Sequence, residues 1–124
     1  MYNLTSRELS FLRRLNSPRK IQDFLDTLVY NFEMKGETCM SPRRVLQERR
    51  AHCIEGAMLA ALALRLQGER PLLLDLTAAP HDLDHVVALY RQHGYWGAIS
   101  KTNHGVLRFR DPIYRTLREL ALSY

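Results

Sequence analysis

Residues 51–66 read AHCIEGAMLAALALRL, and this stretch determines how the rest of the chain can fold. Apart from Cys53 and Glu55 near its start, it is apolar almost to its end. Alanine and leucine are strong helix formers, and Gly68 follows as a helix stop. Because a helix that is apolar on every side belongs in a protein interior, we predict a buried helix that begins at about His52.

The predicted helix carries Cys53 in its first turn. Free backbone N–H groups and the positive end of the helix dipole stabilise a thiolate there, and the thiolate is the nucleophilic form of cysteine. Cysteine is also among the most buried residue types, so a purely structural thiol is the alternative. We expect Cys39, the second cysteine, to be a structural thiol near the site.

The composition fits one domain with one modest core. The chain has 124 residues, of which 46% are hydrophobic. No apolar run approaches the roughly 20 residues that cross a bilayer, and the N-terminus lacks the layout of a secretion signal. Two cysteines are too few for a disulfide scaffold, which fits a reducing compartment. We therefore predict a cytoplasmic protein that does not contact a membrane.

The charge balance raises a nucleic-acid hypothesis. The net charge is +5, and arginine supplies fifteen of the eighteen basic residues. Excess arginine is typical of nucleic-acid binders. The arginines are scattered in pairs, however, and form no basic stripe or known binding signature. We favour a solvated surface with some structural ion pairs, and we keep an Arg-rich nucleic-acid binder as an alternative.

The first third of the chain predicts three helices outside the central one. Leucines at helical spacing predict a helix over residues 5–15, and an apolar stripe that starts at Pro18 predicts a second over 18–34. Ser41 and Pro42 are a cap and a first helical residue, so they predict a third helix over 41–50.

The last third predicts an antiparallel sheet. Strands are expected at residues 71–77, 85–90, 95–100 and 106–110, with loops at 78–83 and 101–105 between them. Alternation places His85, Val87 and Leu89 on one strand face. Asp111 and Pro112 would then cap a final helix through Leu122. Helices followed by a meander indicate an α+β domain over 1–124, divided into a helical part (1–36), the Cys helix with its sheet (37–112) and a C-terminal helix (113–124).

A cysteine at a helix N-terminus and a histidine at the start of a strand form the layout of a Cys–His nucleophile pair. His85 follows Cys53 by some thirty residues. An imidazole can take the thiol proton and then deliver it to the leaving group. The alternative for His85 is an ordinary hydrogen-bonded strand histidine.

A family resemblance adds to this pattern. The run RRAHCIEGA at residues 49–57 resembles the transglutaminase-like branch of the papain-like cysteine fold, as do Leu64, Gly68, DHV at 84–86 and Trp96. The resemblance covers about residues 37–112. It implies a cysteine helix packed on an antiparallel sheet that carries the histidine and an orienting residue. Family members include cross-linking enzymes, peptidases, amidases and inactive proteins. By resemblance, Cys53 would be the nucleophile and His85 the general base and acid.

The orienting position departs from the family pattern. The family usually has an aspartate about four residues after a tryptophan, and Ser100 stands four residues after Trp96. Asp111 resembles the family's aspartate before a proline but comes one strand later, and Asn103 is a further candidate. A serine can accept the imidazole N–H but offers no charge to an imidazolium. We therefore expect Ser100 or Asp111 to orient His85.

Two further predictions concern the reaction's accessory groups. The backbone N–H of Cys53 is a natural oxyanion donor, and Gln47 resembles the glutamine that papain-like proteases place six residues before the cysteine. A surface glutamine is the alternative. The sequence HDLDH at 81–85 raises a zinc hypothesis, but its loop spacing does not put these ligands on one face and no cysteine pair completes the set. We predict no metal and no cofactor.

Together these features predict a cysteine-dependent acyl transferase or amide or peptide hydrolase that acts through a thioester on Cys53. A catalytically inactive transglutaminase-like module that binds a protein partner is the first alternative, and the nucleic-acid binder is the second. The amphipathic pattern of residues 117–124 continues to the last residue. It therefore predicts either a piece of a longer chain or an oligomer formed through this helix.

Overall fold

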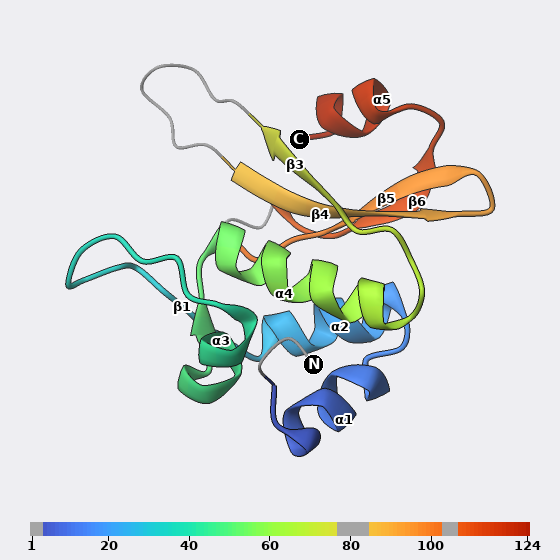
Figure 1. Ribbon diagram of the computed structural model, residues 1–124. Helices are drawn as coiled ribbons and strands as arrows, with labels where there is room; N and C mark the ends of the chain where they lie inside the picture. Colours follow the sequence, from blue (N-terminus) through green and yellow to red (C-terminus); the bar gives the residue numbers. More distant parts are fainter. Residues whose placement is uncertain (1–3, 77–84, 103–106) are drawn as a thin grey trace.

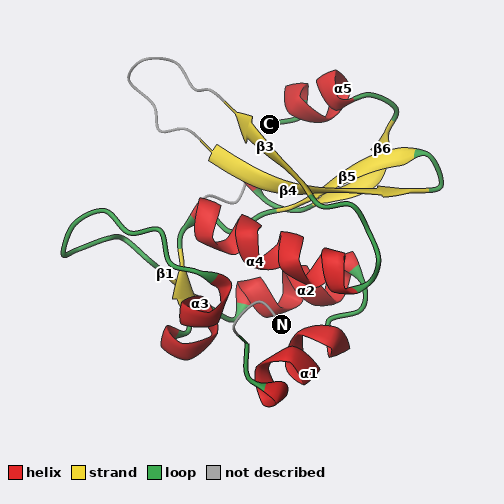
Figure 2. Cartoon of the chain, viewed as in Figure 1, coloured by secondary structure: helices red, strands yellow, loops and turns green. Residues whose placement is uncertain are grey.

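The computed structural model describes residues 4–76, 85–102 and 107–124 (Figure 1). Its elements follow the chain in the order helices, then sheet, then a last helix (Figure 2). They are α1 (Ser6–Arg14), α2 (Pro18–Asp26), β1 (Val29–Tyr30), α3 (Pro42–Glu48), β2 (Arg50–Ala51), α4 (Cys53–Leu66), β3 (Leu72–Leu76), β4 (His85–Gln92), β5 (Tyr95–Ile99), β6 (Arg110–Tyr114) and α5 (Leu117–Leu122).

Helix α4 lies at the centre of the molecule. It packs on β3 and β4 on one side and on α1, α2 and α3 on the other (Figure 1). Leu59, Ala60 and Ala63 of α4 are fully buried. This two-sided cover explains why α4 has no polar face, since a helix covered on both sides has no face to expose to water. The predicted buried helix and the α+β fold are confirmed.

The sheet separates two hydrophobic clusters. Its strand order is β3-β4-β5-β6, and every neighbouring pair is antiparallel. Residues on one face, such as Ala88 and Ile99, join the core around α4. Residues on the other face, Val87 and Leu89, pack with Leu120 of α5. Figure 1 accordingly shows the sheet between α4 and α5.

The predicted starts of the first four helices are confirmed, but the second helix is shorter than predicted. Ser41 caps α3 as expected, with its hydroxyl accepting from Arg44 N. Helix α2 ends at Asp26 rather than near residue 34. The ammonium of Lys101 binds the carbonyl oxygens of Leu25 and Leu28, and the chain then pairs with β2 instead of continuing as helix. Tertiary contacts here override the local apolar pattern.

The prediction for residues 106–114 was wrong. Asp111 and Pro112 do not cap a helix but lie inside β6, which starts at Arg110. Pro112 is accommodated because β6 is an edge strand, where a missing N–H breaks no ladder bond. Helix α5 begins only at Leu117, with Thr116 as its cap. The expected loop at 78–83 lies outside the described residues, as does the part of the turn from Asn103 onward.

Helix α5 packs on the four-stranded sheet of the same chain through Leu120, which is fully buried. Leu122, on the same helix, is 74% exposed.

Within the described ranges, none of the helices has both the length and the apolar character needed to cross a membrane.

Replacing Gly56 with alanine should destabilise the protein. An added Cβ would overlap Lys101 Cβ and lie 3.1 Å from Lys101 Cγ. We expect a loss of about 1–3 kcal/mol in the free energy of unfolding, measured by urea denaturation. In a helix without this contact, Gly→Ala stabilises by roughly 0.5–1 kcal/mol. A gain in stability would therefore contradict the close approach of α4 to Lys101.

Candidate active site

The backbone before α4 sets the position of Cys53. Residues of β2 pair in parallel with β1, and His52 stays extended (φ −97°, ψ −171°) before the helix begins. Cys53 is therefore the first residue of α4, as predicted, and its side chain is partly exposed. A thiol in this position is open to small reagents while it remains next to the helix N-terminus.

His85 is held by a serine hydroxyl. The Nε2 atom of His85 lies 2.8 Å from Ser100 Oγ, and Ser100 Oγ donates to the carbonyl oxygen of Leu107 at 2.6 Å. A hydroxyl has only one hydrogen, so towards His85 it must accept. In the neutral ring, Nε2 then carries the proton and Nδ1 is the basic nitrogen. Both side chains are buried, His85 at 7% and Ser100 at 1% exposure.

An aromatic ring lies near His85. The His85 and Tyr124 ring centroids are 6.0 Å apart. Burial raises the pKa of Tyr124 to about 12, although the nearby Arg110 opposes this rise. Tyr124 is therefore neutral at physiological pH and presents an uncharged wall to the imidazole.

Helix α4 and the Ser100 segment meet directly. Gly56 lies three residues after Cys53, on the same side of α4, and it touches Lys101, the residue after Ser100. His85 is the first residue of β4, and Figure 1 shows α4 and β4 beginning at the same end of the molecule. Cys53 thus begins its helix at the same end of the helix–sheet layer as His85 and Ser100, while alternation along β4 places the His85 side chain with Val87 and Leu89 on the sheet face that α5 covers.

Gln22 is a part of this arrangement that sequence reasoning missed. Its side-chain amide donates to the carbonyl of Ser100 at 2.8 Å and accepts from Ser100 N at 2.9 Å. Gln22 also donates to Asp26 Oδ1 at 2.8 Å, which fixes the amide orientation. Helix α2, to which the sequence assigned no chemistry, therefore holds the backbone of the residue that binds His85. The only available signal was a polar residue beside Ile21 on the apolar side of α2.

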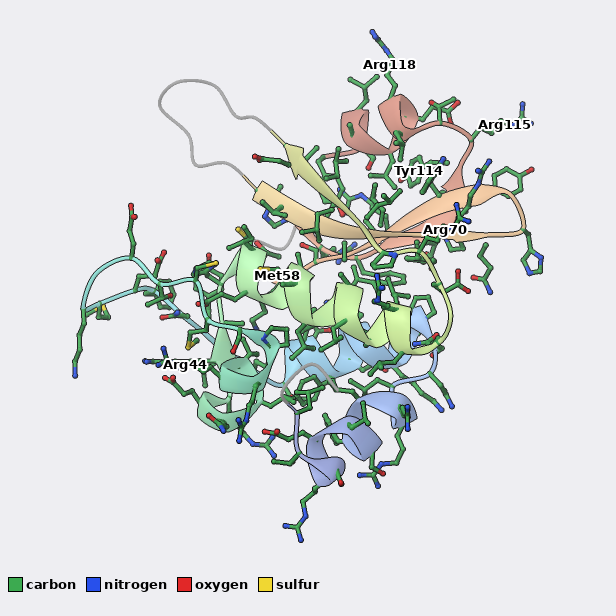
Figure 3. All side chains as sticks on the ribbon, in the orientation of Figure 1. Arg44, Met58, Arg70, Tyr114, Arg115 and Arg118 are labelled. Atoms are coloured by element: carbon green, nitrogen blue, oxygen red, sulfur yellow. The ribbon has the colours of Figure 1, made fainter. Side chains whose placement is uncertain are left out.

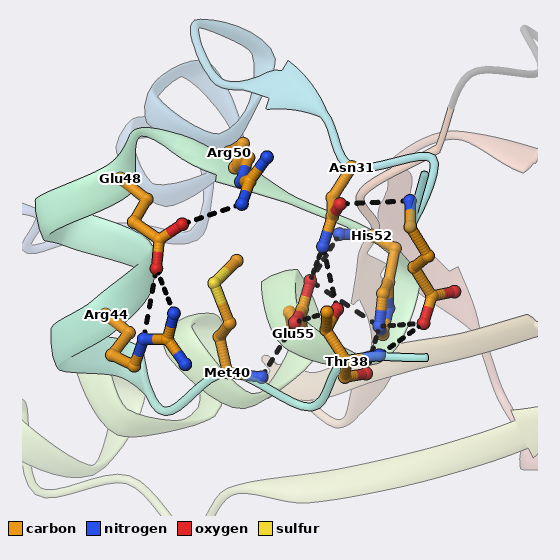
Figure 4. A network of polar contacts seen from close by, with 9 residues as sticks. Asn31, Thr38, Met40, Arg44, Glu48, Arg50, His52 and Glu55 are labelled. Atoms are coloured by element: carbon orange, nitrogen blue, oxygen red, sulfur yellow. Dashed lines mark hydrogen bonds and ion pairs between the residues drawn. The ribbon is translucent and has the colours of Figure 1, made fainter. Parts of the chain in front are cut away.

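A buried carboxylate anchors the loop beside Cys53 (Figure 4). Glu55 has no exposed surface, and four donors surround it. Its Oε1 accepts from Asn31 Nδ2 and His52 N, both at 3.0 Å. Its Oε2 accepts from Thr38 Oγ1 at 2.9 Å and Met40 N at 2.7 Å. The loop between β1 and α3 is thereby tied to the first turn of α4.

The hydrogen bonds at Glu55 decide its ionisation. Burial on its own would raise the pKa of Glu55, because it penalises the charged form. The donors from Asn31, Met40, His52 and Thr38 outweigh burial, so the pKa is lowered below its ordinary value of 4.5. Glu55 is therefore a carboxylate at neutral pH.

Gln47 lies on a surface groove, and Asp111 lies away from His85 and Ser100. Gln47 is exposed and lines a surface groove with Leu62, which is nine residues beyond Cys53, or roughly 13.5 Å along the helix axis. Asp111 is exposed on β6, two strands from β4. The residue before it, Arg110, pairs with Ala98 of β5, which in turn pairs with Leu89 of β4. Leu89 lies about 13 Å along β4 from His85. The structure therefore brings Ser100, and not Asp111, to His85.

The residues of the zinc hypothesis before His85 lie outside the described residues, as does Asn103. In the part of the chain that the structure describes, no three His, Cys, Asp or Glu side chains are grouped as a metal site.

Many arginines have partners within the fold. Figure 3 shows Arg44 and Arg118 at opposite ends of the molecule in that view, rather than on one patch. Ion pairs join Arg43 to Glu8, Arg44 to Glu48 and Arg50 to Glu48. The guanidinium groups of Arg19, Arg91 and Arg110 lie over Phe109, Trp96 and Tyr124.

A solved structure described as the crystal structure of a TGase, a transglutaminase, is similar to this chain. The two align over 90% of this chain with a TM-score of 0.60 and 15% sequence identity. The chain has a transglutaminase-like fold. No family model and no curated protein matches its sequence.

The likeness extends over part of the solved transglutaminase only. The chain spans 37% of the length of that structure. At 15% identity the likeness establishes the fold, which confirms the predicted packing of the cysteine helix on an antiparallel sheet.

Replacing Gln22 with leucine should release Ser100. Because two buried backbone groups of Ser100 lose their partners, we expect a loss of about 1–3 kcal/mol in the free energy of unfolding. The ¹⁵N NMR shifts of the His85 ring should also move towards a mixture of tautomers. Asp23→Leu, at an exposed position of the same helix, is the control and should leave these shifts unchanged. Unaltered ring shifts in Gln22→Leu would show that Gln22 does not act on His85.

Replacing Glu55 with glutamine should lower stability and flatten its pH dependence. An amide NH₂ would face donors in place of one carboxylate oxygen, so we expect a loss of about 2–4 kcal/mol near neutral pH. Because folding lowers the pKa of Glu55, its stabilisation is complete above pH 4.5 and is lost as the pH falls below that value. In urea titrations, the variant should therefore lose less stability than the parent protein as the pH falls below 4.5.

The control for Glu55 is Glu37→Gln, an exposed carboxyl of the same loop. It should keep both the stability and the acid slope of the parent protein. Equal acid slopes in Glu55→Gln and the parent protein would contradict an ionised Glu55.

Proposed function

We propose that this chain is a cysteine-dependent acyl transferase or amide hydrolase, with Cys53 as the nucleophile and His85 as the general base and acid. The observation that carries the proposal is the hydrogen bond from His85 Nε2 to Ser100 Oγ. It supports a ring whose basic nitrogen is Nδ1, at the end of the sheet where α4 begins. The transglutaminase-like fold is consistent with this assignment.

The proposed reaction has two halves. The Sγ atom of Cys53 attacks the carbonyl carbon of an amide or peptide while His85 takes the thiol proton. The tetrahedral intermediate collapses as the C–N bond breaks, His85 gives its proton to the leaving amine, and a thioester remains on Cys53. Water or a second amine then attacks the thioester, His85 accepts a proton from it, and Sγ leaves and is protonated again. Water yields an acid, and an amine yields a new amide.

The oxyanion of each tetrahedral intermediate needs a donor. We assign this role to the backbone N–H of Cys53, since the first N–H groups of a helix have no intrahelical partner. Gln47, the second predicted donor, is the weaker candidate because it lines the groove beside Leu62. No cofactor enters the proposed chemistry.

The neutral Ser100 favours a second candidate function, an inactive binding module on the same fold. A serine fixes the imidazole tautomer but does not stabilise an imidazolium as a carboxylate would. In such a module Cys53 would be an ordinary thiol, so the two functions differ in the reactivity of one sulfur atom.

Cys53 should react with iodoacetamide faster than Cys39. Both are free thiols, and Cys39 is the more exposed of the two. An ordinary thiol is only a few per cent ionised at pH 7, so an activated Cys53 should react about tenfold faster or more. Mass spectrometry of the two cysteine peptides over time measures both rates in one sample.

His85→Asn and Ser100→Ala should bring the rate of Cys53 down towards that of Cys39 and leave Cys39 unchanged. A parent protein in which Cys53 reacts more slowly than Cys39 would overturn the proposed nucleophile and favour the binding module.

A further inference from the structure

The short pair formed by β1 and β2 has two chemically different faces. Tyr30 pairs with Ala51, and Asn31 N donates to Ala51 O at 3.0 Å, which extends the ladder by one residue. Residues paired directly across two strands share a face, and successive residues alternate between faces. Tyr30 and Ala51 therefore lie on one face, and Asn31 lies on the other.

The extended backbone carries this alternation to the candidate nucleophile. His52 has strand-like dihedral angles, so its ring is directed away from the Ala51 face and Cys53 returns to it. Figure 4 agrees, since Asn31 and His52 lie together in the buried polar network. Tyr30, Ala51 and Cys53 therefore share the opposite, apolar face.

Phe32 extends this apolar face into solvent. It follows Tyr30 by two residues, and the two rings meet edge to face with centroids 4.8 Å apart. Tyr30 is half-buried, whereas Phe32 is 63% exposed. An aromatic ring left largely in water gains free energy when a ligand covers it.

The buried network holds the loop that carries this aromatic pair. Asn31 and Thr38, which precede and follow Phe32, both donate to Glu55. The side chain of Glu33 is fixed as well, since it accepts from Thr38 N at 2.6 Å. The exposed ring is therefore presented from a loop tied to the first turn of α4.

We infer that Tyr30 and Phe32 form an apolar subsite that binds an aromatic or large aliphatic side chain of the acyl donor, beside the carbonyl that Cys53 attacks. The inference rests on the proposed function and adds a substrate class to it. The preferred substrate is a peptide or amide with an apolar group next to the reacting carbonyl. Such a group covers Phe32 and stacks at the rim of Tyr30.

Tyr30 remains neutral in this subsite. Burial raises its pKa, and the charges of Cys53, Glu33 and Glu55 raise it further. A protonated phenol keeps the subsite uncharged, and it favours apolar groups over acidic ones.

The test compares two alkylating probes, chloroacetamide and N-benzyl-chloroacetamide. With both, Sγ displaces chloride and forms a thioether, so they differ only in the benzyl group. The ratio of their rates at Cys53 is divided by the same ratio for N-acetylcysteine. We expect a preference for the benzyl probe of about threefold to tenfold in the parent protein. Phe32→Ser should abolish this preference without changing the chloroacetamide rate.

Ile113→Ser is the matched control, because Ile113 is 65% exposed on the distant strand β6. It should keep the benzyl preference. A reactive Cys53 with no benzyl preference, or with a preference that survives Phe32→Ser, overturns the subsite and leaves the proposed function standing. A Cys53 that reacts more slowly with chloroacetamide than Cys39 does overturns the proposed function itself.

Discussion

The structure depends on covering α4 from both sides. A helix without a polar face must be enclosed, and here the sheet encloses one side and three helices the other. Enclosure also brings a cost, because Glu55 at the start of the helix loses all contact with water. Four hydrogen-bond donors compensate for this burial, and three of them, Asn31, Thr38 and Met40, belong to the loop between β1 and α3. The loop is thus held in place by the carboxylate to which it donates hydrogen bonds.

A second centre of organisation lies at the end of β5. Ser100 receives Gln22 on its backbone and His85 on its hydroxyl, and the next residue, Lys101, reaches the end of α2 and touches Gly56. Burial lowers the pKa of Lys101, although Asp26 opposes this effect. Two adjacent residues therefore connect α2, α4 and β4 at one point. Because α2 holds Ser100 and α4 carries Cys53, the candidate nucleophile and its base are positioned through the same few contacts.

The sequence predicted what local rules determine. The all-apolar helix, the serine cap of α3 and the antiparallel strands were expected because spacing and capping signals are local. The end of α2 was not, because it depends on a lysine 73 residues away in sequence from Leu28. The role of Gln22 was not predicted for the same reason, since its partner Ser100 is 78 residues away in sequence. Pro112 gave a helix signal that an edge strand also accommodates, and only the sheet order distinguishes the two.

The two contacts of the Ser100 side chain explain why a hydroxyl suits this position better than the carboxylate of an aspartate. Its oxygen accepts from the imidazole of His85 and its hydrogen goes to the carbonyl of Leu107. An ionised carboxylate accepts but does not donate, so it would face the Leu107 carbonyl with no hydrogen between them. The backbone at Leu107 is therefore arranged for a hydroxyl. The serine therefore fixes the tautomer of His85, and as a neutral group it supplies no charge that would stabilise an imidazolium. The orientation of the ring and the stabilisation of its charge are separable properties, and this fold retains the first.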